Sequence, residues 1–218
     1  MLAKFCRAAL ALLVLATAVP AAALAAPPRP VELSDQDRAD LKRLEDWLNG
    51  IRTMSARFTQ YSDGGTASGV VYLKRPGNMR FEYDAPVPYM LMANGTWVIY
   101  YDKSVEQVSY LPINSTPAWF LLKDNITLGG DVTVTGFERG PGVIRVTIVQ
   151  TKEPDSGKVT LTFGDKPLEL KQWTLVDAQG KRTTVTLNDA RYGDPLDPKL
   201  FVFNDPRPLQ GVKRGNSN

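Results

Sequence analysis

The chain has 218 residues, with 26 lysines and arginines against 23 aspartates and glutamates, which gives a formal net charge of +3. This near balance leaves no basic surplus for nucleic acid, so we expect no nucleic-acid partner. The sequence contains no histidine, which excludes histidine-based acid–base catalysis and argues against zinc and copper sites. We therefore expect no metal site and no cofactor.

Residues 1–25 have the form of a secretory signal peptide. Two basic residues precede an apolar run over residues 8–19, and Ala23-Leu24-Ala25 supplies the small residues of a cleavage site. The apolar run is too short to span a bilayer, and no later segment reaches the ~20 apolar residues that a span requires. Cleavage after Ala25 would leave residues 26–218 as a soluble exported protein, and this length predicts a single domain.

The cysteine pattern bears on location. The only cysteine, Cys6, lies inside the predicted signal peptide and before its apolar run, so it does not occupy a lipid-attachment position. The expected mature chain then has no thiol, no disulfide and no lipid anchor. An exported domain without disulfides fits a bacterial periplasm, which is the predicted location.

One amphipathic helix is predicted near the start of the mature chain. Ser34-Asp35-Gln36-Asp37 has the form of a capping box, and the helix should end near Asn49-Gly50. We expect it to cover one face of a sheet. The apolar residues at helical spacing are Leu41, Leu44, Leu48 and Ile51, with Trp47 beside them.

After residue 51 the apolar residues alternate with a period of two, which predicts β-strands separated by tight turns such as Pro76-Gly77 and Asn94-Gly95. Many short strands with such turns predict an antiparallel, meandering sheet. Residues 112–130 interrupt the pattern with a short predicted helix, and long insertions of this kind are often lids. The predicted strands are 67–75, 79–84, 89–93, 96–101, 106–111, 131–138, 143–150, 158–163, 168–176, 182–190 and 200–203.

Hairpin loop length predicts which side chains share a face. A three-residue loop at Pro76-Gly77-Asn78 would set Arg75 opposite Met79 and Leu73 opposite Phe81, which gathers the apolar residues on one face. A two-residue loop would mix apolar and charged residues on each face. The pattern therefore places Arg75 on the apolar side of the sheet.

The next hairpin is apolar on both faces. A two-residue turn at Asn94-Gly95 would pair Met92 with Trp97 and Met90 with Ile99 on one face. One face can meet the helix, and the other must be covered by a second layer or by a ligand. Methionine suits surfaces that accept variable apolar partners, but it also serves as ordinary core filler, and the pattern allows both.

Arg75 allows two interpretations, because a buried guanidinium is costly unless its donors are satisfied. It can form a structural ion pair with a carboxylate inside the sheet. Alternatively, it can act as a latch that binds backbone carbonyls of the 112–130 insertion. No catalytic arrangement competes with these interpretations: Glu82 and Asp84 share their face with other charged residues, and no nucleophile elbow occurs. We therefore expect no enzyme.

Seven short stretches follow one another in a fixed order along the chain. They are FTQ (58–60), Ser68-Gly69, LKRPGNMRFEYDAP (73–86), NGTWVIYYD (94–102), VEQV (105–108), TPAWFLL (116–122) and DPKLFVF (197–203). In this order, with a signal peptide and a mature chain without cysteine, they resemble the LolA-type outer-membrane lipoprotein carriers of Gram-negative bacteria. The likeness covers roughly residues 35 to 205.

The resemblance implies a mainly β fold with helices (α+β). A single strongly curved antiparallel sheet, or half-barrel, would be covered by the N-terminal helix and a short-helix lid around an apolar cavity. The cavity would take the acyl chains of lipoproteins released by an ABC-type complex in the inner membrane. The carrier, expected to be a monomer, would bring them through the periplasm to an outer-membrane receptor.

The resemblance also implies roles for single residues. An arginine in the family's "RP" motif holds the lid shut in the empty form, and Arg75 matches it. Met79 and Phe81 match the second-strand positions where many members have aromatic residues. With the face assignment above, the predicted lining of the cavity is Met79, Phe81, Tyr83, Met90, Met92, Trp97 and Ile99, with Trp119, Phe120 and Leu121 from the lid.

Two other functions share this fold. The outer-membrane receptor related to the carrier is itself a lipoprotein with a cysteine at the cleavage site, which this sequence lacks, so the shuttle is preferred. The alternative is a periplasmic lipid-binding or lipoprotein-sensing module.

Overall fold

The computed structural model describes residues 28–116 and 119–207. The predicted signal peptide, residues 1–25, lies outside this part of the chain. Within the described ranges, no helix is both long enough and apolar enough to cross a membrane.

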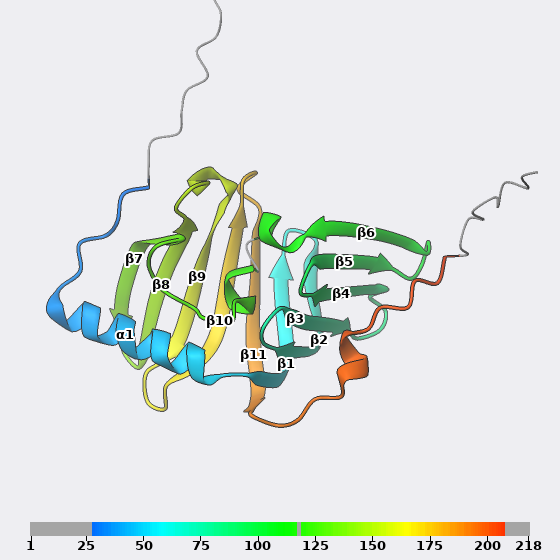
Figure 1. Ribbon diagram of the computed structural model, residues 1–218, viewed down its shortest axis with the longest axis horizontal. Helices are drawn as coiled ribbons and strands as arrows, with labels where there is room; N and C mark the ends of the chain where they lie inside the picture. Colours follow the sequence, from blue (N-terminus) through cyan, green and yellow to red (C-terminus); the bar gives the residue numbers. More distant parts are fainter. Residues whose placement is uncertain (1–27, 117–118, 208–218) are drawn as a thin grey trace, which may run out of the picture.

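Eleven antiparallel strands form one large open sheet with β6 and β7 at its two edges (Figure 1). Neighbouring strands are consecutive in the chain except at the centre, where β1 pairs with β11 and joins two meanders. This confirms the predicted antiparallel sheet. The strands are β1 (Thr53–Ser62), β2 (Gly65–Lys74), β3 (Asn78–Tyr83), β4 (Tyr89–Asn94), β5 (Trp97–Asp102), β6 (Gln107–Pro112), β7 (Val132–Gly140), β8 (Val143–Gln150), β9 (Gly157–Gly164), β10 (Glu169–Asp177) and β11 (Arg182–Tyr192).

Two strand predictions were wrong. Strand β1 was not predicted, although its buried Met54, Ala56 and Phe58 alternate with polar residues as in a half-buried strand. The predicted strand at 200–203 is not formed: residues 200–201 belong to η3 (Pro198–Phe201), a 3-10 helix, and 202–203 follow it without regular structure. Two further 3-10 helices are η1 (Ile113–Ser115) and η2 (Pro154–Ser156).

Helix α1 (Asp35–Gly50) begins with the predicted capping box. The Ser34 hydroxyl accepts a hydrogen bond from the Asp37 backbone N–H at 3.2 Å, and the Asp37 carboxylate accepts one from the Ser34 backbone N–H at 2.9 Å. The helix crosses one face of the sheet over β7 to β11, with Leu44 and Leu48 fully covered (Figure 1). We call this covered side the inner face and the opposite side the outer face.

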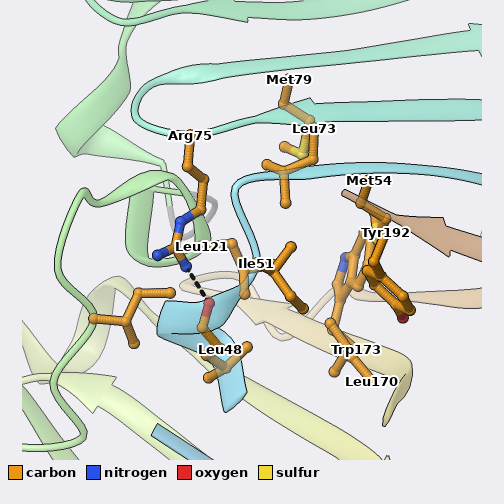
Figure 2. A pocket seen from close by; sticks show the side chains of 11 residues that line it. Leu48, Ile51, Met54, Leu73, Arg75, Met79, Leu121, Leu170, Trp173 and Tyr192 are labelled. Atoms are coloured by element: carbon orange, nitrogen blue, oxygen red, sulfur yellow. Dashed lines mark hydrogen bonds between the residues drawn. The ribbon is translucent and has the colours of Figure 1, made fainter. Parts of the chain in front are cut away.

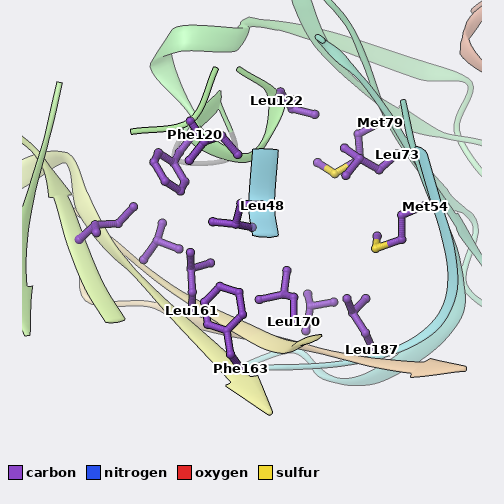
Figure 3. Close-up of a cluster of buried hydrophobic side chains, with 14 of the residues drawn as sticks. Leu48, Met54, Leu73, Met79, Phe120, Leu122, Leu161, Phe163, Leu170 and Leu187 are labelled. Atoms are coloured by element: carbon purple, nitrogen blue, oxygen red, sulfur yellow. The ribbon is translucent and has the colours of Figure 1, made fainter. Parts of the chain in front are cut away.

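The main core lies on the inner face, and the sheet curves around it (Figure 3). Leu161 and Phe163 of β9 lie on one side of the core, and Leu73 of β2 and Met79 of β3 lie on the other. Burying such large apolar side chains supplies most of the driving force for folding. The curvature therefore leaves a space between the two halves that α1 and the segment after β6 close.

The β2–β3 loop has the predicted odd length, so the apolar residues of both strands share the inner face. The loop is Arg75-Pro76-Gly77, however, and Leu73 pairs with Met79 rather than with Phe81. Arg75 therefore lies in the turn instead of opposing Met79. Gly77 in this turn has φ +80°, a left-handed conformation that glycine adopts without strain.

Candidate functional site

The segment between β6 and β7, described over residues 113–116 and 119–131, crosses from one edge strand to the other over the inner face (Figure 1). We call it the lid. It contains helix α2 (Trp119–Leu122), whose Phe120 and Leu122 are buried, and Ile126 beyond it is fully buried. The insertion predicted from the sequence is therefore present as a cover over the core.

Two neighbouring apolar chambers lie beneath the lid. The Arg75 chamber is drawn in Figure 2 and has a free volume of about 20 Å³, close to the room that one water molecule needs. The Tyr83 chamber has a free volume of about 140 Å³. Met79, Leu121 and Trp173 line both chambers, so the two lie next to each other.

The remaining lining comes from both halves of the sheet and from α1. The Arg75 chamber is also lined by Leu48, Ile51, Met54, Leu73, Arg75, Ile126, Leu170 and Tyr192. The Tyr83 chamber is also lined by Gln60, Phe81, Tyr83, Leu91, Val159, Leu175, Thr183 and Val185.

Arg75 is 6% exposed and reaches from the β2–β3 turn to α1 and the lid. Its Nη1 donates to the Leu48 carbonyl at 2.8 Å (Figure 2). Its Nη2 donates over longer distances, 3.3 Å to the Asp124 carbonyl in the lid and 3.4 Å to Asn49 Oδ1. Burial, together with the nearby Arg52 cation, lowers the pKa of the Arg75 guanidinium from its ordinary value.

These contacts bear on the two interpretations of Arg75. Within residues 28–116 and 119–207, Arg75 forms no ion pair with a carboxylate, and the Asp124 side chain pairs instead with Arg52 at 2.6 Å. The predicted contact with an insertion carbonyl is present at Asp124. A second carbonyl, that of Leu48 in the last turn of α1, was not expected. The role of these contacts as a latch stays a prediction.

Other tethers of the lid were not foreseen from the sequence. The Asn49 side chain pairs with the Ile126 backbone in both directions, each at 2.8 Å. Glu45 accepts a hydrogen bond from the Leu128 N–H at 2.8 Å, and Gly77 donates its N–H to the Leu122 carbonyl at 2.8 Å. The lid is therefore attached on one side to α1 and on another to the β2–β3 turn.

The structure brings four of the predicted lining residues together. Met79, Phe81, Tyr83 and Leu121 all line the chambers, and their role in ligand binding stays a prediction. Phe120 is buried in the core, with the half-buried Trp119 against it at a ring-centroid distance of 6.2 Å. Neither of these two side chains lines the chambers.

The prediction that Met90, Met92, Trp97 and Ile99 line the same cavity is wrong. Strand β4 pairs with β3 so that Phe81 lies opposite Leu91, which sends Met90 and Met92 to the outer face. There Met90, Met92 and Ile99 form a separate buried cluster against Phe203 of the C-terminal segment. Trp97 lies on the same face and is 40% exposed.

The turn after β4 also differs from the prediction. Met92 pairs with Ile99 rather than with Trp97. This shift of the register by two residues leaves each side chain on the same face of the hairpin as predicted. The Asn94 side chain accepts hydrogen bonds from the Thr96 and Trp97 N–H groups at 3.2 and 2.9 Å, which closes the turn one residue later than expected.

The lining residues that the sequence analysis missed come mostly from strands far along the chain. Trp173 and Leu175 of β10 and Val185 of β11 reach the chambers because β11 pairs with β1. Their alternating pattern was visible in the runs 168–176 and 182–190. Nothing in the sequence indicated that these runs fold back beside β1.

Comparisons with known proteins agree with this geometry. Residues 49–204 match the family model for the outer membrane lipoprotein carrier protein LolA. An outer-membrane lipoprotein carrier protein from Pseudomonas aeruginosa is 30% identical over 180 residues, covering 78% of this chain and 86% of the relative. A relative of the same description from Azotobacter vinelandii is 31% identical, covering 78% of this chain and 86% of the relative. Another from Methylococcus capsulatus is also 31% identical, covering 79% of this chain and 87% of the relative. The chain therefore belongs to the LolA family of outer-membrane lipoprotein carrier proteins.

Proposed function

We propose that this protein is a periplasmic carrier that binds the acyl chains of lipoproteins and moves them toward the outer membrane. The observation that carries the proposal is the pair of neighbouring apolar chambers beneath a tethered lid. An apolar interior of this kind suits acyl chains, since removing methylene groups from water is favourable.

We infer from the small free volume that this conformation is the closed one. About 140 Å³ in the larger chamber leaves room for only a short stretch of acyl chain. Cargo therefore has to displace the lid with its Leu121, and the flexible Met79 side chain beneath it. Methionine and leucine side chains at the junction of the chambers can repack at low cost.

A closed competing state also makes release possible. Burying acyl chains releases about 0.8 kcal/mol per methylene, so an anchor with on the order of 40 methylenes would release roughly 30 kcal/mol. Non-covalent binding saturates near 20 kcal/mol, and at that strength release would be impractically slow. The contacts of Arg75 with α1 and the lid stabilise the closed state, and so they oppose loading and assist release.

The partners follow from this role. We infer that an ABC-type lipoprotein-release complex in the inner membrane loads the carrier and that an outer-membrane receptor unloads it. Residues 1–25 would direct export to the periplasm, and residues 26–218 would act as a single carrier domain with no catalytic step.

The test is to incubate the purified protein with inner membranes that contain acylated lipoproteins, the release complex and ATP. We expect a lipoprotein to leave the membranes in a complex with this protein, with its acyl anchor intact by mass spectrometry. Recovery of phospholipid alone, or of no lipid, would contradict the proposal.

A further inference from the structure

The inner face changes from apolar to polar along its strands. Gln60 lies opposite Val185 in the β1–β11 pair, and the next inner-face residue of β11 is Thr183. Tyr83 ends β3 two strands away, opposite Gly69, which in turn lies opposite Phe58. The polar residues therefore gather at one end of the sheet. The apolar rows that lead to them are Met54, Ala56 and Phe58 on β1, Met79 and Phe81 on β3, and Leu187 and Val185 on β11.

These three polar side chains line the Tyr83 chamber, away from Arg75. The Tyr83 hydroxyl donates to Gln60 Oε1 at 2.9 Å, and its ring packs edge-on against Phe58 with the centroids 5.2 Å apart. The Gln60 amide nitrogen and the Thr183 hydroxyl have no hydrogen-bond partner among residues 28–116 and 119–207. They are donors that a ligand in the chamber can reach.

The polar groups of the Tyr83 chamber carry no charge. No charged side chain of the described residues lines it, whereas the other chamber contains the Arg75 guanidinium. A charged headgroup would lose its hydration here without gaining an opposite charge, which is costly. Ester and amide carbonyls accept hydrogen bonds without carrying a charge, and they match the donors of Gln60 and Thr183.

We propose that Gln60, Tyr83 and Thr183 form a polar subsite for the ester and amide carbonyls that join the acyl chains to the cargo's glyceryl-cysteine. The acyl chains then run from this subsite past Met79 and Leu121 toward Arg75. This inference rests on the proposed carrier function and adds the orientation of the cargo. It also gives a preference for neutral acyl esters over lipids with charged headgroups.

The experiment compares two probes on each variant of the signal-free protein. One probe is a fluorescent peptide whose N-terminal cysteine carries a diacylglyceryl group and an N-acyl chain. The other is N-phenyl-1-naphthylamine, a neutral apolar dye without a carbonyl group. Thr183→Val removes the hydroxyl, and Gln60→Leu removes the amide, including the oxygen that accepts from the Tyr83 hydroxyl, both at nearly constant volume. Each should weaken binding of the peptide about two- to tenfold and leave dye binding unchanged.

Thr186→Val is the matched control. Thr186 lies on β11 like Thr183, but between the inner-face residues Val185 and Leu187, so its side chain is on the outer face. It should change the affinity for neither probe. Thermal unfolding of each variant checks that the comparison is made on folded protein.

The possible results separate the subsite from the carrier function. Unchanged peptide affinity in both Gln60→Leu and Thr183→Val would overturn the subsite, while a wild type that still binds the peptide would keep the carrier function. An equal loss for the peptide and the dye would also overturn it, because the substitutions would then have damaged the whole chamber. A wild type that binds neither probe would contradict the carrier function itself.

Discussion

Replacing Arg75 with leucine should make the carrier hold its cargo more persistently. The substitution removes one short hydrogen bond, from Nη1 to the Leu48 carbonyl at 2.8 Å, and two long ones at 3.3 and 3.4 Å that contribute little. In the closed form the Leu48 carbonyl would lose this partner. In an open form, in which α1 and the lid tethered to it through Asn49 and Glu45 separate from the β2–β3 turn, water can reach this carbonyl.

The magnitude follows from the short bond. A hydrogen bond that involves a charged group contributes about 1.5–3 kcal/mol, which corresponds to roughly a tenfold to hundredfold change in the ratio of closed to open protein. The leucine also adds apolar surface on which acyl chains can lie. We expect the loaded fraction to rise by this factor and the release of cargo to slow.

The assay follows transfer in two steps. The carrier is first loaded with a lipoprotein from inner membranes, and acceptor outer membranes are then added while the soluble lipoprotein is measured. Arg75→Leu should load at least as well as the wild type and deliver less to the acceptor membranes.

Arg52→Leu is the control, because Arg52 contacts the same lid residue from the surface. Its guanidinium pairs with the Asp124 carboxylate at 2.6 Å, and its side chain is 58% exposed. Exposed pairs of this kind contribute about 0–1 kcal/mol, so its effect on transfer should be small. The latch account is refuted if Arg75→Leu only lowers the melting temperature while its folded fraction loads and releases like the wild type.

Three further predictions concern other parts of the molecule. Ile99→Ala should lower the free energy of unfolding by about 2–5 kcal/mol, yet leave dye affinity unchanged, because this buried side chain lies on the outer face. Gly77→Ala should raise the affinity for the dye and lower the melting temperature. The added Cβ would lie 2.7 Å from the Gly95 backbone and would disturb the hydrogen bond from the Gly77 N–H to the Leu122 carbonyl of the lid. Unchanged dye binding would contradict the view that this bond holds the lid closed. Arg43 lowers the pKa of the Asp165 carboxyl, so this pair stabilises the fold above about pH 4 and less as the pH falls. The melting temperature of Asp165→Asn should therefore fall less than that of the wild type on acidification, and parallel curves would count against this pair.

The sequence predicted the sheet, the capped helix and the lid because each has a local signal. The capping box at Ser34 and the odd number of residues in the loop between β2 and β3 depend on residues that are close in the chain. Arg75 stood out because it interrupts an apolar pattern, and its burial was foreseen for that reason. Its main acceptor, the Leu48 carbonyl, lies on a separate element and had no local signal.

The face assignment of β4 and β5 failed for a physical reason. Both faces of this hairpin are apolar, because Phe203 of the C-terminal segment packs against its outer face. The alternation of residues therefore cannot show which face of β4 continues the inner face on which Phe81 lies. The connection over residues 84–88 has no turn signature that would fix the β3–β4 register. The stretch 200–203 was interpreted as a strand, so its role as this cover was not considered.

The central claim is that acyl chains lie beneath the lid on the inner face. The most direct measurement places the photoreactive residue p-benzoyl-phenylalanine at Leu121, between the two chambers, or at Trp97 on the outer face. Each variant is loaded with a lipoprotein whose acyl chains are labelled, and is then irradiated. The account predicts that Leu121 crosslinks to the labelled chains and that Trp97 does not. Crosslinking from Trp97 with none from Leu121 would contradict it.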